Sequence, residues 1–399
     1  MDPSVGLGVT SDLHAGGNPH VLTLTPFYPS EADDSFGCFV SEPLQGLAKI
    51  GVRNRVLAVQ PFYRGRRRSG GSAVRGEWLR YFSMPGGFGL PTAGAFVFAR
   101  IVPRLRMLHR SQPFDLIHAH GALPCGHTAM LLSRALNIPF VVSVHGLDAF
   151  SREQVKGRSG AWSVRISRLV YAASNRVICV SDHVRQEVIR GMDRPCRTSV
   201  VYNGVDPELF SPNPAEASSV LSILSVGNLI PIKGHEHLIR ALALLATEFS
   251  SLQLRIIGDG PERCSLEKLA ARLQVSEKVR FHGRESRATV AAAMRECTVF
   301  ALPSRYEGLG CVYLEAMSCS KPVVGCQGQG ISEIVQPGVG GYLVAPGDEK
   351  ELTDVLRILL RDPDRRRALG EAGRATILNR LTIQHQSANL YRVYRECLQ

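Results

Sequence analysis

The chain has 399 residues, of which 44% are hydrophobic and 21% charged, and its formal net charge at pH 7 is +12. This length predicts two domains, and this composition predicts globular domains with complete hydrophobic cores. No apolar run approaches the roughly 18 uninterrupted residues of a membrane-spanning helix, so the sequence argues against a transmembrane protein.

The amino-terminal stretch MDPSVGLGVTSDLHAGGNPH has neither a basic start nor an apolar centre. We therefore expect a polar leader here and not a secretory signal peptide. The ten cysteines form no CxxC pair and no Cys/His cluster, so we expect reduced thiols. Together these features predict a cytoplasmic protein.

Short apolar segments alternate with amphipathic ones through the first half of the chain. The expected strands are HVLTLTP, NRVLAVQ, FDLIHAHG, FVVSVHG, RVICVSD and TSVVYNG, with helical patterns such as PCGHTAMLLSRALN and DHVRQEVIRG between them. Nearly continuous apolar strands separated by helices are typical of a parallel sheet covered on both faces. The sequence therefore predicts a doubly wound α/β domain over residues 20–205.

A second series with the same character follows VDPELFSPNPAEASS, which has the composition of a linker. Its expected strands are SILSVGN, LRIIGDG, VRFHG, CTVFALP, KPVVGC and GYLVAP. They predict a second doubly wound α/β domain over residues 218–380, and residues 381–399 form a helix that could pack across the hinge. Ligands bind beyond the carboxyl ends of such sheets, so we expect a cleft between the domains.

Positive charge is concentrated in one part of the first domain. Between Gly51 and Ser111 there are twelve Arg and one acidic residue, Glu77, a balance of 12 − 1 = +11. Phospholipid head groups or a phosphate-bearing acceptor would suit this segment, and the alternative is a solvated basic face without a partner. No nucleic-acid recognition motif accompanies the charge, so we expect no nucleic acid partner.

The segment RYEGLGCVYLEAMS carries the clearest chemical signal. It follows the apolar strand CTVFALPS and places a turn before a helical pattern. Gly308 and Gly310 allow close approach of a ligand to the backbone, and the N–H groups of Gly310, Cys311 and Val312 would be free at a helix start to bind an anion.

Two carboxylates flank this turn, Glu307 before it and Glu315 about one helical turn beyond it. A carboxylate repels a diphosphate, so each is suited to neutral hydroxyls, Glu315 to a ribose and Glu307 to a sugar at the other end of the diphosphate. The alternative is two exposed surface charges. Lys233 lies in the strand–loop–helix unit SVGNLIPIKGHEHLIRAL, where its charge could neutralise a phosphate.

Taken together, these motifs resemble the E-x7-E signature of retaining glycosyltransferases with the GT-B fold, specifically glycosyltransferase family 4 (glycosyl transferases group 1). The resemblance covers nearly the full chain, through FDLIHAHG, VVSVHGLD, RVICVSDHVRQEVI and VVYNGVDPELF in the first half and SVGNLIPIKGHEHLIRAL, RIIGDGPE, VRFHGR and LPSRYEGLGCVYLEAMSCSKPVVGC in the second. It implies that the second domain binds a nucleotide-sugar, linked to UDP or GDP, and that the first binds the acceptor.

The resemblance also assigns roles to individual residues. It implies that Glu307, His145 and Lys233 act at the reacting sugar and diphosphate. The expected donor-binding residues are Gly37, Asn228, Lys233, Gly258, Gly283, Arg284, Glu307, Gly308, Leu309, Gly310, Cys311, Val312 and Glu315.

The sequence departs from the family pattern at two positions. Many members carry Arg where this chain has Asn228, and Arg305 is one candidate for the missing cation. The usual second glycine of the acceptor loop is Cys38, which follows Gly37.

The implied activity is transfer of a hexose-type sugar, with retention of configuration, to a hydroxyl of a glycan or a lipid-linked acceptor, as in synthesis of cell-surface polysaccharides or glycolipids. No metal or other cofactor is expected: Asp362 and Asp364 of the DPD segment have the pattern of helix caps. We expect the acidic EADDS segment near Glu31 to be solvated.

Interleaved apolar and basic residues in AFVFARIVPRLRMLHRS predict an amphipathic stretch that could lie on an anionic membrane, at the inner face of the plasma membrane. Three other functions compete with this interpretation. A nicotinamide dehydrogenase should show GxGxxG after an early strand, which HVLTLTPFYPS lacks. A non-catalytic sugar-nucleotide-binding protein and a nucleotide-sugar epimerase share the expected fold.

Overall fold

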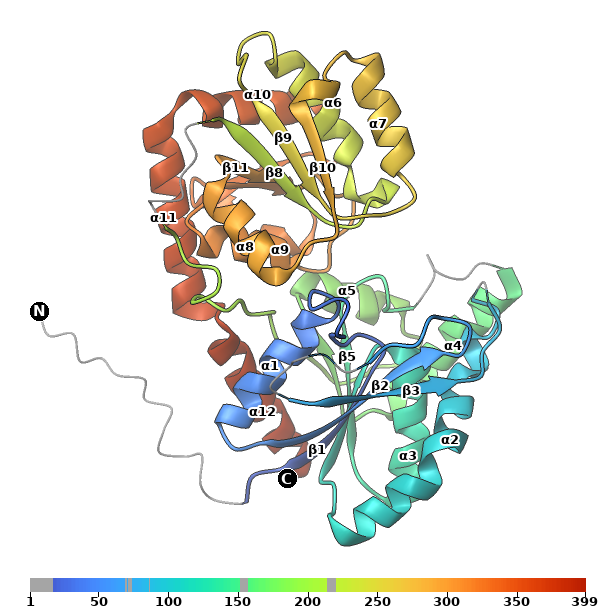
Figure 1. Ribbon diagram of the computed structural model, residues 1–399. Coiled ribbons are helices and arrows are strands. Elements are labelled where there is room, and N and C mark those ends of the chain that lie inside the picture. The colour runs from blue at the N-terminus through green and yellow to red at the C-terminus, as the bar shows by residue number, and fades with distance from the viewer. Residues whose placement is uncertain (1–16, 69, 71–73, 86, 151–156, 214–219) are drawn as a thin grey trace, which may run out of the picture.

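The computed structural model describes residues 17–68, 70, 74–85, 87–150, 157–213 and 220–399, so the expectation of a polar leader falls largely outside the described residues. Two parallel sheets, each flanked by helices, lie one above the other in Figure 1. This arrangement confirms the predicted fold, two doubly wound α/β domains.

The first sheet has seven strands in the order β3-β2-β1-β4-β5-β6-β7, all parallel to their neighbours. The strand order reverses between β1 and β4. The elements of this domain are β1 (His20–Thr25), α1 (Cys38–Lys49), β2 (Arg53–Pro61), β3 (Gly76–Tyr81), α2 (Leu90–Ser111), β4 (Leu116–His120), η1 (Ala122–Gly126), α3 (His127–Leu136), β5 (Phe140–Val144), α4 (Gly157–Ala173), β6 (Arg176–Cys179), α5 (Asp182–Gly191) and β7 (Thr198–Val200).

The second sheet repeats this design in the order β10-β9-β8-β11-β12-β14-β13, with its reversal between β8 and β11. Its elements are β8 (Ser222–Val226), η3 (Pro231–Lys233), α6 (His235–Leu245), β9 (Gln253–Ile257), α7 (Arg263–Arg272), η4 (Ser276–Lys278), β10 (Val279–Gly283), α8 (Arg287–Glu296), β11 (Val299–Ala301), α9 (Cys311–Ser318), β12 (Val323–Cys326), η5 (Gly330–Glu333), β13 (Gln336–Pro337), β14 (Gly340–Val344), α10 (Glu349–Arg361), α11 (Pro363–Arg380) and α12 (Ile383–Leu398).

The two central strands of the first sheet illustrate why the apolar segments form buried strands. Every residue of β4 and β5 is buried, including the polar residues between the aliphatic ones. Strands covered on both faces consist mainly of β-branched and aliphatic side chains, which is the pattern in the sequence. Two strands were not predicted, the edge strand β3 and the two-residue β13.

The last helix, α12, returns from the second domain to the first. In Figure 1 it descends beside α1, and its buried side chains Leu390 and Tyr394 share a hydrophobic cluster with Val40 and Leu44 of α1. The Ser387 hydroxyl donates a hydrogen bond to the carbonyl of Pro43 at 3.1 Å. The carboxyl end of the chain is therefore part of the first domain's packing.

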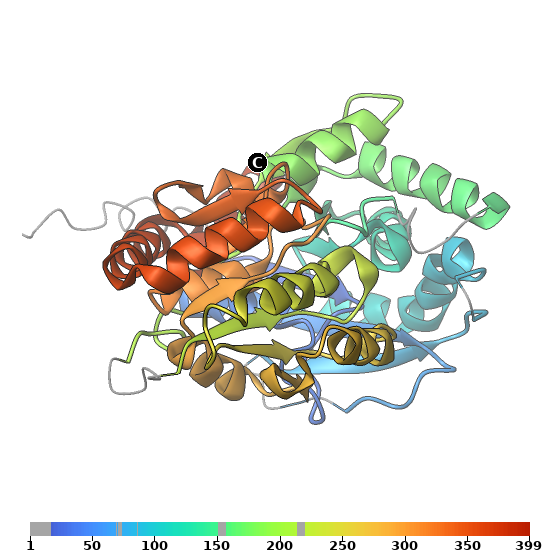
Figure 2. The same cartoon turned by 90° about the horizontal axis from the view of Figure 1, so that it is seen from above.

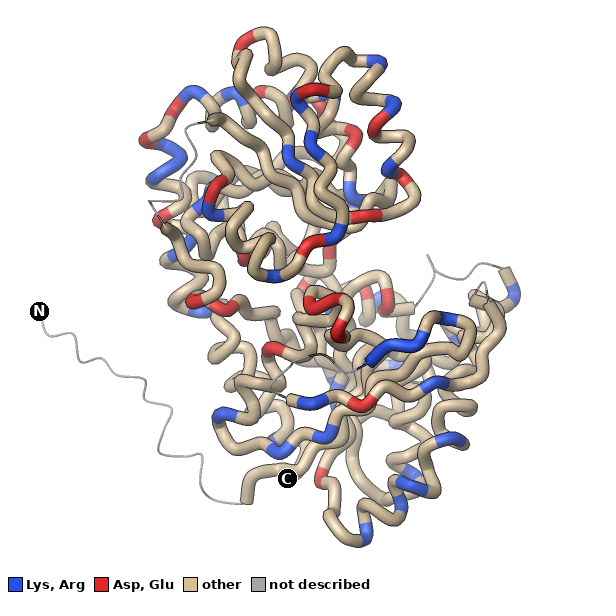
Figure 3. Tube along the Cα trace, viewed as in Figure 1, with Lys and Arg blue, Asp and Glu red and all other residues tan. Residues whose placement is uncertain are grey.

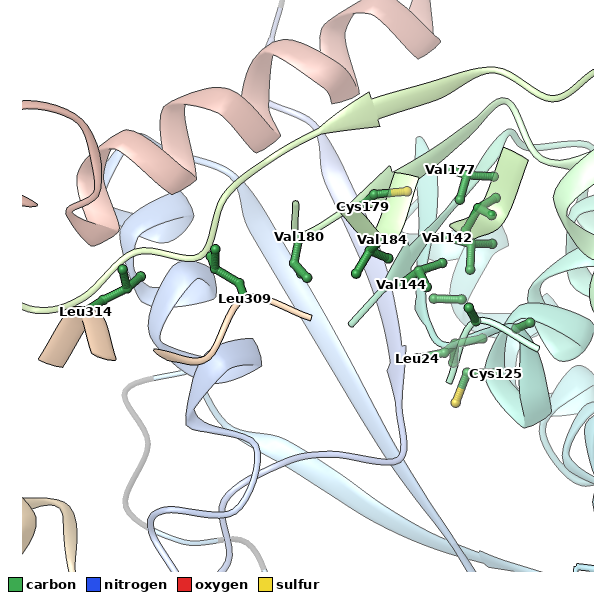
Figure 4. Packing of buried hydrophobic residues seen from close by; sticks show 14 of the residues in the cluster. Leu24, Cys125, Val142, Val144, Val177, Cys179, Val180, Val184, Leu309 and Leu314 are labelled. Carbon is green, nitrogen blue, oxygen red and sulfur yellow. The ribbon is translucent and has the colours of Figure 1, made fainter. Parts of the chain in front are cut away.

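Apolar contact also continues from one domain to the other. In Figure 4, Val180 and Leu309 lie between the strands of the first domain and Leu314 of α9, and all three belong to one buried cluster. Part of the expected linker is packed as well, since Val205 and Phe210 are buried. Seen from above, the helices α2, α3 and α4 of the first domain extend beyond the second domain (Figure 2).

All ten cysteines are free, as the sequence predicted. Within the described residues, no helix combines the length and apolar character needed to cross a membrane.

Candidate active site between the two domains

A cleft of about 340 Å³ lies between the domains, at the reversal point of the second sheet. Loops after β8, β9 and β11 form one wall, and residues of the first domain form the other. The lining residues are Ser35, Cys38, Phe39, His145, Asn203, Val226, Gly227, Asn228, Lys233, Ile257, Gly258, Arg284, Glu285, Arg287, Val290, Glu307, Gly308, Leu309, Gly310, Cys311, Val312 and Glu315.

The loop before α9 fits against the first domain only because of its glycines. A Cβ on Gly308 would lie 2.2 Å from the carbonyl oxygen of His145, and the Ser181 hydroxyl donates to the carbonyl of Gly308 at 2.5 Å. Gly310 has φ of +80° and precedes α9 as its cap. The first N–H groups of a helix have no partner within it, so those of Cys311 and Val312 are available in the cleft.

Lys233 and Glu307 lie together in this cleft and form a direct ion pair. Their side chains are 19% and 12% exposed, so water screens the pair only partly. Lys233 ends the short helical turn η3, and the positive φ of Gly234 turns the chain into α6. The structure therefore brings together a cation and a carboxylate that are 74 residues apart.

Glu315 is buried, so it is not the exposed helix residue of the alternative interpretation. One of its oxygens accepts a hydrogen bond from Arg287 of α8, and the other has no hydrogen-bond partner among the described residues. Arg287 also donates to Glu42 of α1 at 2.6 and 3.1 Å, so this arginine links the two domains. The nearby carboxylates help to raise the pKa of Arg287 well above its usual value although burial opposes this.

His145 is the first domain's imidazole in the cleft, and it belongs to a stack of three histidines. Its Nε2 is hydrogen bonded to Nδ1 of His120 at 3.0 Å, and the ring of His120 stacks on that of His118. His118 is hydrogen bonded to the hydroxyl of Tyr394 in α12 at 2.7 Å.

Burial lowers the pKa of His145 to about 4 and that of His118 to about 3. Both rings are therefore neutral at pH 7. Nδ1 of His145 has no hydrogen-bond partner among the residues that the structure describes. A neutral ring in this position can exchange a hydrogen bond with a sugar hydroxyl but cannot act as a cation.

Two cysteines in the cleft carry no charge. Burial raises the pKa of Cys38 to about 12 and that of Cys311 well above its usual value. A protonated thiol is a weak nucleophile, so neither side chain is prepared for covalent catalysis.

The other residues expected at the donor site divide into two groups. Asn228, Gly258 and Arg284 line the cleft, whereas Gly37 and Gly283 do not. Gly37 has φ of +76° and starts α1, and a Cβ there would lie 2.4 Å from the backbone of Phe27. It therefore shapes the loop that brings Cys38 and Phe39 to the cleft.

Arg287 lies in the same cleft as Asn228, the residue that stands where many family members carry arginine. The sequence did not identify Arg287 as a site residue. The candidate that was named, Arg305, is exposed and is not among the lining residues. Nothing in the sequence around Arg287 distinguishes it from an exposed arginine in a first helical turn. Only the fold shows that α1 and α9 enclose its side chain between carboxylates.

The acidic EADDS segment, which was expected to be solvated rather than to bind a ligand, has exposed carboxylates that also contact the second domain. Asp33 accepts a hydrogen bond from Arg284 at 3.3 Å, and Asp34 accepts one from the backbone of Arg287 at 3.3 Å. The segment therefore contributes to the contact between the domains. By contrast, Asp362 caps α11 by accepting a hydrogen bond from the N–H of Arg365, which confirms the interpretation of DPD as a helix cap.

Across the described ranges, no three His, Cys, Asp or Glu side chains are grouped so that they could hold a metal ion.

Comparison with known proteins agrees with this geometry. The family model of glycosyl transferases group 1 matches residues 209–376, and that of glycosyltransferase family 4 matches residues 39–209. An uncharacterized glycosyltransferase of Methanocaldococcus jannaschii is 32% identical over 265 residues, which is 66% of this chain and 70% of the relative. The D-inositol 3-phosphate glycosyltransferase of Frankia alni is 34% identical over 70% of this chain and 74% of the relative.

Among solved structures, that of the Anabaena protein HepE with UDP-glucose has a TM-score of 0.74 at 22% identity and covers 95% of this chain and all of HepE. The two sheets and the interdomain cleft are thus those of the GT-B fold, and the family models identify a glycosyltransferase that uses a nucleotide-sugar donor. More narrowly, the chain belongs to glycosyltransferase family 4.

Proposed function

We propose that the protein transfers a sugar from a UDP-sugar to a hydroxyl of a glycan or lipid-linked acceptor, with retention of the anomeric configuration. In this reaction the bond between the anomeric carbon and the diphosphate oxygen breaks, and a bond from that carbon to the acceptor oxygen forms. The hydroxyl proton leaves with the diphosphate. The choice of UDP follows HepE, which was crystallised with UDP-glucose.

One observation carries the proposal: a cation, a helix start, two carboxylates and an imidazole share a single cleft. Lys233 and the first N–H groups of α9 would stabilise the charge that develops on the leaving diphosphate. Glu307 and the neutral His145 would hold hydroxyls of the transferred sugar. No residue is assigned as a covalent nucleophile.

The donor is best tested by differential scanning fluorimetry with matched UDP- and GDP-sugars. A ligand that binds only the folded state raises the melting temperature, because it adds to the free energy of unfolding. At a ligand concentration of 100 times the dissociation constant, this addition is about 2.7 kcal/mol. We expect UDP-sugars to raise it more than GDP-sugars, and release of UDP to require an acceptor. Binding of a UDP-sugar with no transfer would instead favour a non-catalytic sugar-nucleotide-binding protein, and isomerisation of the donor would favour an epimerase.

We also propose that the first domain works at an anionic membrane surface, through a different face from the one expected. The apolar face of α2 is not free, because its buried residues, among them Val97, Ile101 and Leu105, belong to the domain core. Exposed aromatic residues lie nearby instead: the rings of Phe62 and Phe82 stack at 5.5 Å, and Phe96 meets Phe82 at 5.3 Å.

Basic residues are concentrated in the same segment of the first domain. Figure 3 shows Lys and Arg along α2 and in the loop after β2, and five arginines line one hollow of about 860 Å³. Those five are Arg55, Arg66, Arg67, Arg68 and Arg75. Of the twelve arginines in this segment, Arg55 and Arg104 form ion pairs, both with Glu77. The other ten form no ion pair with a carboxylate of the described residues.

Sedimentation with anionic liposomes at low and high salt tests this second proposal. We expect binding at low salt that weakens as salt rises, since exposed charges are screened within about 10 Å at 0.1 M. Phe82→Ser should weaken it, while Leu244→Ser on α6 serves as a matched control because Leu244 is equally exposed on the other domain. Absence of binding at low salt would end the proposal.

A further inference from the structure

The imidazole of His145 in the cleft is held by a second imidazole, that of His120 at the end of β4. Nδ1 of His120 lies 3.0 Å from Nε2 of His145, and the planes of the two rings differ by 10°. At this distance the two nitrogen atoms share one hydrogen bond, so one of them carries the proton and the other accepts it. His120 is 5% exposed and is not among the residues that line the cleft, so it can act on a ligand only through His145.

Both rings are neutral near pH 7, which limits each of them to a single proton. Burial lowers the pKa of His145 to about 4. Burial, and then the neighbouring rings of His118 and His145, lower the pKa of His120 well below its usual value. A neutral imidazole has one N–H and one lone pair. Two arrangements of the protons are therefore possible, and they differ in what His145 offers at Nδ1.

In the first arrangement, Nε2 of His145 donates to Nδ1 of His120. The proton of His120 then lies on its own Nε2, a buried atom without a hydrogen-bond partner among the described residues. A buried N–H group without an acceptor has lost its hydrogen bonds to water, and such groups are rare in proteins. No ligand in the cleft could replace the lost bond, because His120 does not reach the cleft.

In the second arrangement, Nδ1 of His120 donates to Nε2 of His145. Nε2 of His120 is then a lone pair, and buried acceptors without a partner are less rare than buried N–H groups without one. The proton of His145 lies on Nδ1, which is also unpaired within the described part of the chain. Because His145 lines the cleft, water or a sugar oxygen can accept this proton. The second arrangement therefore leaves no N–H group without an acceptor in the core.

The ring of His120 is supported by that of His118. The centres of these two rings are 4.4 Å apart and their planes differ by 30°. Both nitrogen atoms of His118 are hydrogen bonded, one to the hydroxyl of Ser143 and the other to that of Tyr394, each at 2.7 Å. Tyr394 belongs to α12, the helix that returns from the second domain. This packing limits the movement of His120 and keeps its ring beside His145.

We propose that His120 is a positioning residue, which donates a hydrogen bond from Nδ1 to Nε2 of His145 and so fixes the tautomer of His145 that carries its proton on Nδ1. The proposal rests on the proposed sugar transfer, since it concerns how that site holds the donor sugar. His145 then offers a hydrogen-bond donor, so the sugar must present an oxygen lone pair to it. This complements Glu307, whose ionised carboxylate only accepts hydrogen bonds.

¹⁵N NMR of the histidine rings tests the tautomer in the whole protein without any ligand. A protonated ring nitrogen and one with a lone pair have well-separated ¹⁵N chemical shifts, and a His145→Gln variant identifies the signals of His145. We expect the proton of wild-type His145 on Nδ1. A proton on Nε2 would overturn the proposal.

Variants of His120 test whether this residue fixes the tautomer. His120→Leu removes the hydrogen-bond donor, so the signals of His145 should move toward the average of the two tautomers. His120→Asn places an amide N–H near the position of Nδ1 and should keep the proton of His145 on Nδ1. His20→Leu is the matched control, because His20 is a buried histidine of the same domain at the start of β1, outside the cleft, and should leave these signals unchanged.

The wild-type tautomer in His120→Leu would show that His120 does not fix it. If His120→Leu does not fold, the wild type and His120→Asn still decide, because a proton on Nε2 of His145 in either of them contradicts the assignment.

Isothermal titration calorimetry with UDP-glucose and with UDP separates a positioning role from general damage to the cleft. His120→Leu should weaken binding of UDP-glucose about tenfold, the effect of one lost hydrogen bond to the sugar, and should leave binding of UDP unchanged. Equal weakening of both ligands would mean that the cleft is distorted and would overturn the positioning role. If wild-type protein does not bind UDP-glucose, the proposed donor is wrong, whereas the ¹⁵N spectra of the free protein still decide the tautomer.

Discussion

Replacement of Arg287 by methionine should destabilise the protein more than any other single change at the contact between the domains. Its guanidinium forms ion pairs with Glu42 of the first domain and Glu315 of the second. The side chain of Arg287 is 11% exposed, that of Glu42 19% and that of Glu315 4%. Methionine keeps much of the volume but leaves two carboxylates facing each other in a largely buried position. Removing one partner of such an ion pair costs about 3–5 kcal/mol.

Arg284 provides the matched control, because it also joins the domains through a carboxylate. Its pair with Asp33 has a distance of 3.3 Å, and its side chain is 58% exposed. An exposed pair contributes about 0–1 kcal/mol, so Arg284→Met should have little effect. Urea denaturation followed by circular dichroism measures both free energies of unfolding, and the second variant controls for general effects of losing a positive charge.

A third variant tests the electrostatic cause. Adding Glu42→Gln to Arg287→Met should recover part of the loss, because only one buried charge then remains without a partner. If Arg287→Met cost no more than Arg284→Met, or if Glu42→Gln made it worse, the carboxylates would not be held by this arginine, and the reasoning would be wrong.

Three further predictions follow from neighbouring contacts. Lys233→Ala should lower kcat/KM about 10²–10³-fold, because the variant loses stabilisation of the diphosphate. Lys321→Ala, outside the cleft, is the control and should leave kcat/KM unchanged. If both variants had the same kcat/KM, Lys233 would not belong to the site. Burial raises the pKa of Asp148 to about 6 from 3.8, so its charge costs stability above pH 6 and the cost disappears as pH falls toward 4. Asp148→Asn should therefore stabilise the protein at pH 7.5, by up to roughly 3 kcal/mol at 1.36 kcal/mol per pKa unit, and not at pH 4, which urea titrations at both values would check. Glu333→Gln should cost about 1–2 kcal/mol in the same assay, because this carboxylate accepts hydrogen bonds from the first N–H groups of α5 at 2.7 and 2.8 Å; an unchanged midpoint would contradict that role.

The fold could be predicted because its central strands are buried on both faces, which requires nearly continuous apolar segments such as FVVSV. The edge strand β3 gives no such signal. Its residues GEWLRY include Glu77 and Arg80; three of the six are only partly buried, and Arg80 is exposed. An edge strand can keep charged side chains in water, so its sequence does not differ from that of a polar loop.

The residues of the site also differ in how well the sequence predicts them. Residues in local motifs could be predicted, whereas contacts between distant segments could not. Lys233, Glu307 and Glu315 could be placed in one cleft because each lies in a recognisable motif at the end of a strand. The partner of Glu315, Arg287, could not be placed there. Arg287 and Glu42 are 245 residues apart and meet only when the domains face each other, so no spacing in the sequence relates them.

The charges in the cleft indicate how a donor would be accommodated. Lys233 is paired with one carboxylate, so an arriving diphosphate can take over this cation and release Glu307 for sugar hydroxyls. Arg287 is less available to the diphosphate, because it is paired with two carboxylates, Glu42 and Glu315. If Arg287 moved to the diphosphate, both carboxylates would lose their partner. Glu315 therefore keeps one oxygen on Arg287, and only its second, unpaired oxygen is left for the ribose. A ribose bound here would therefore donate a single hydrogen bond to Glu315, from one hydroxyl, while Arg287 fixes the carboxylate that accepts it.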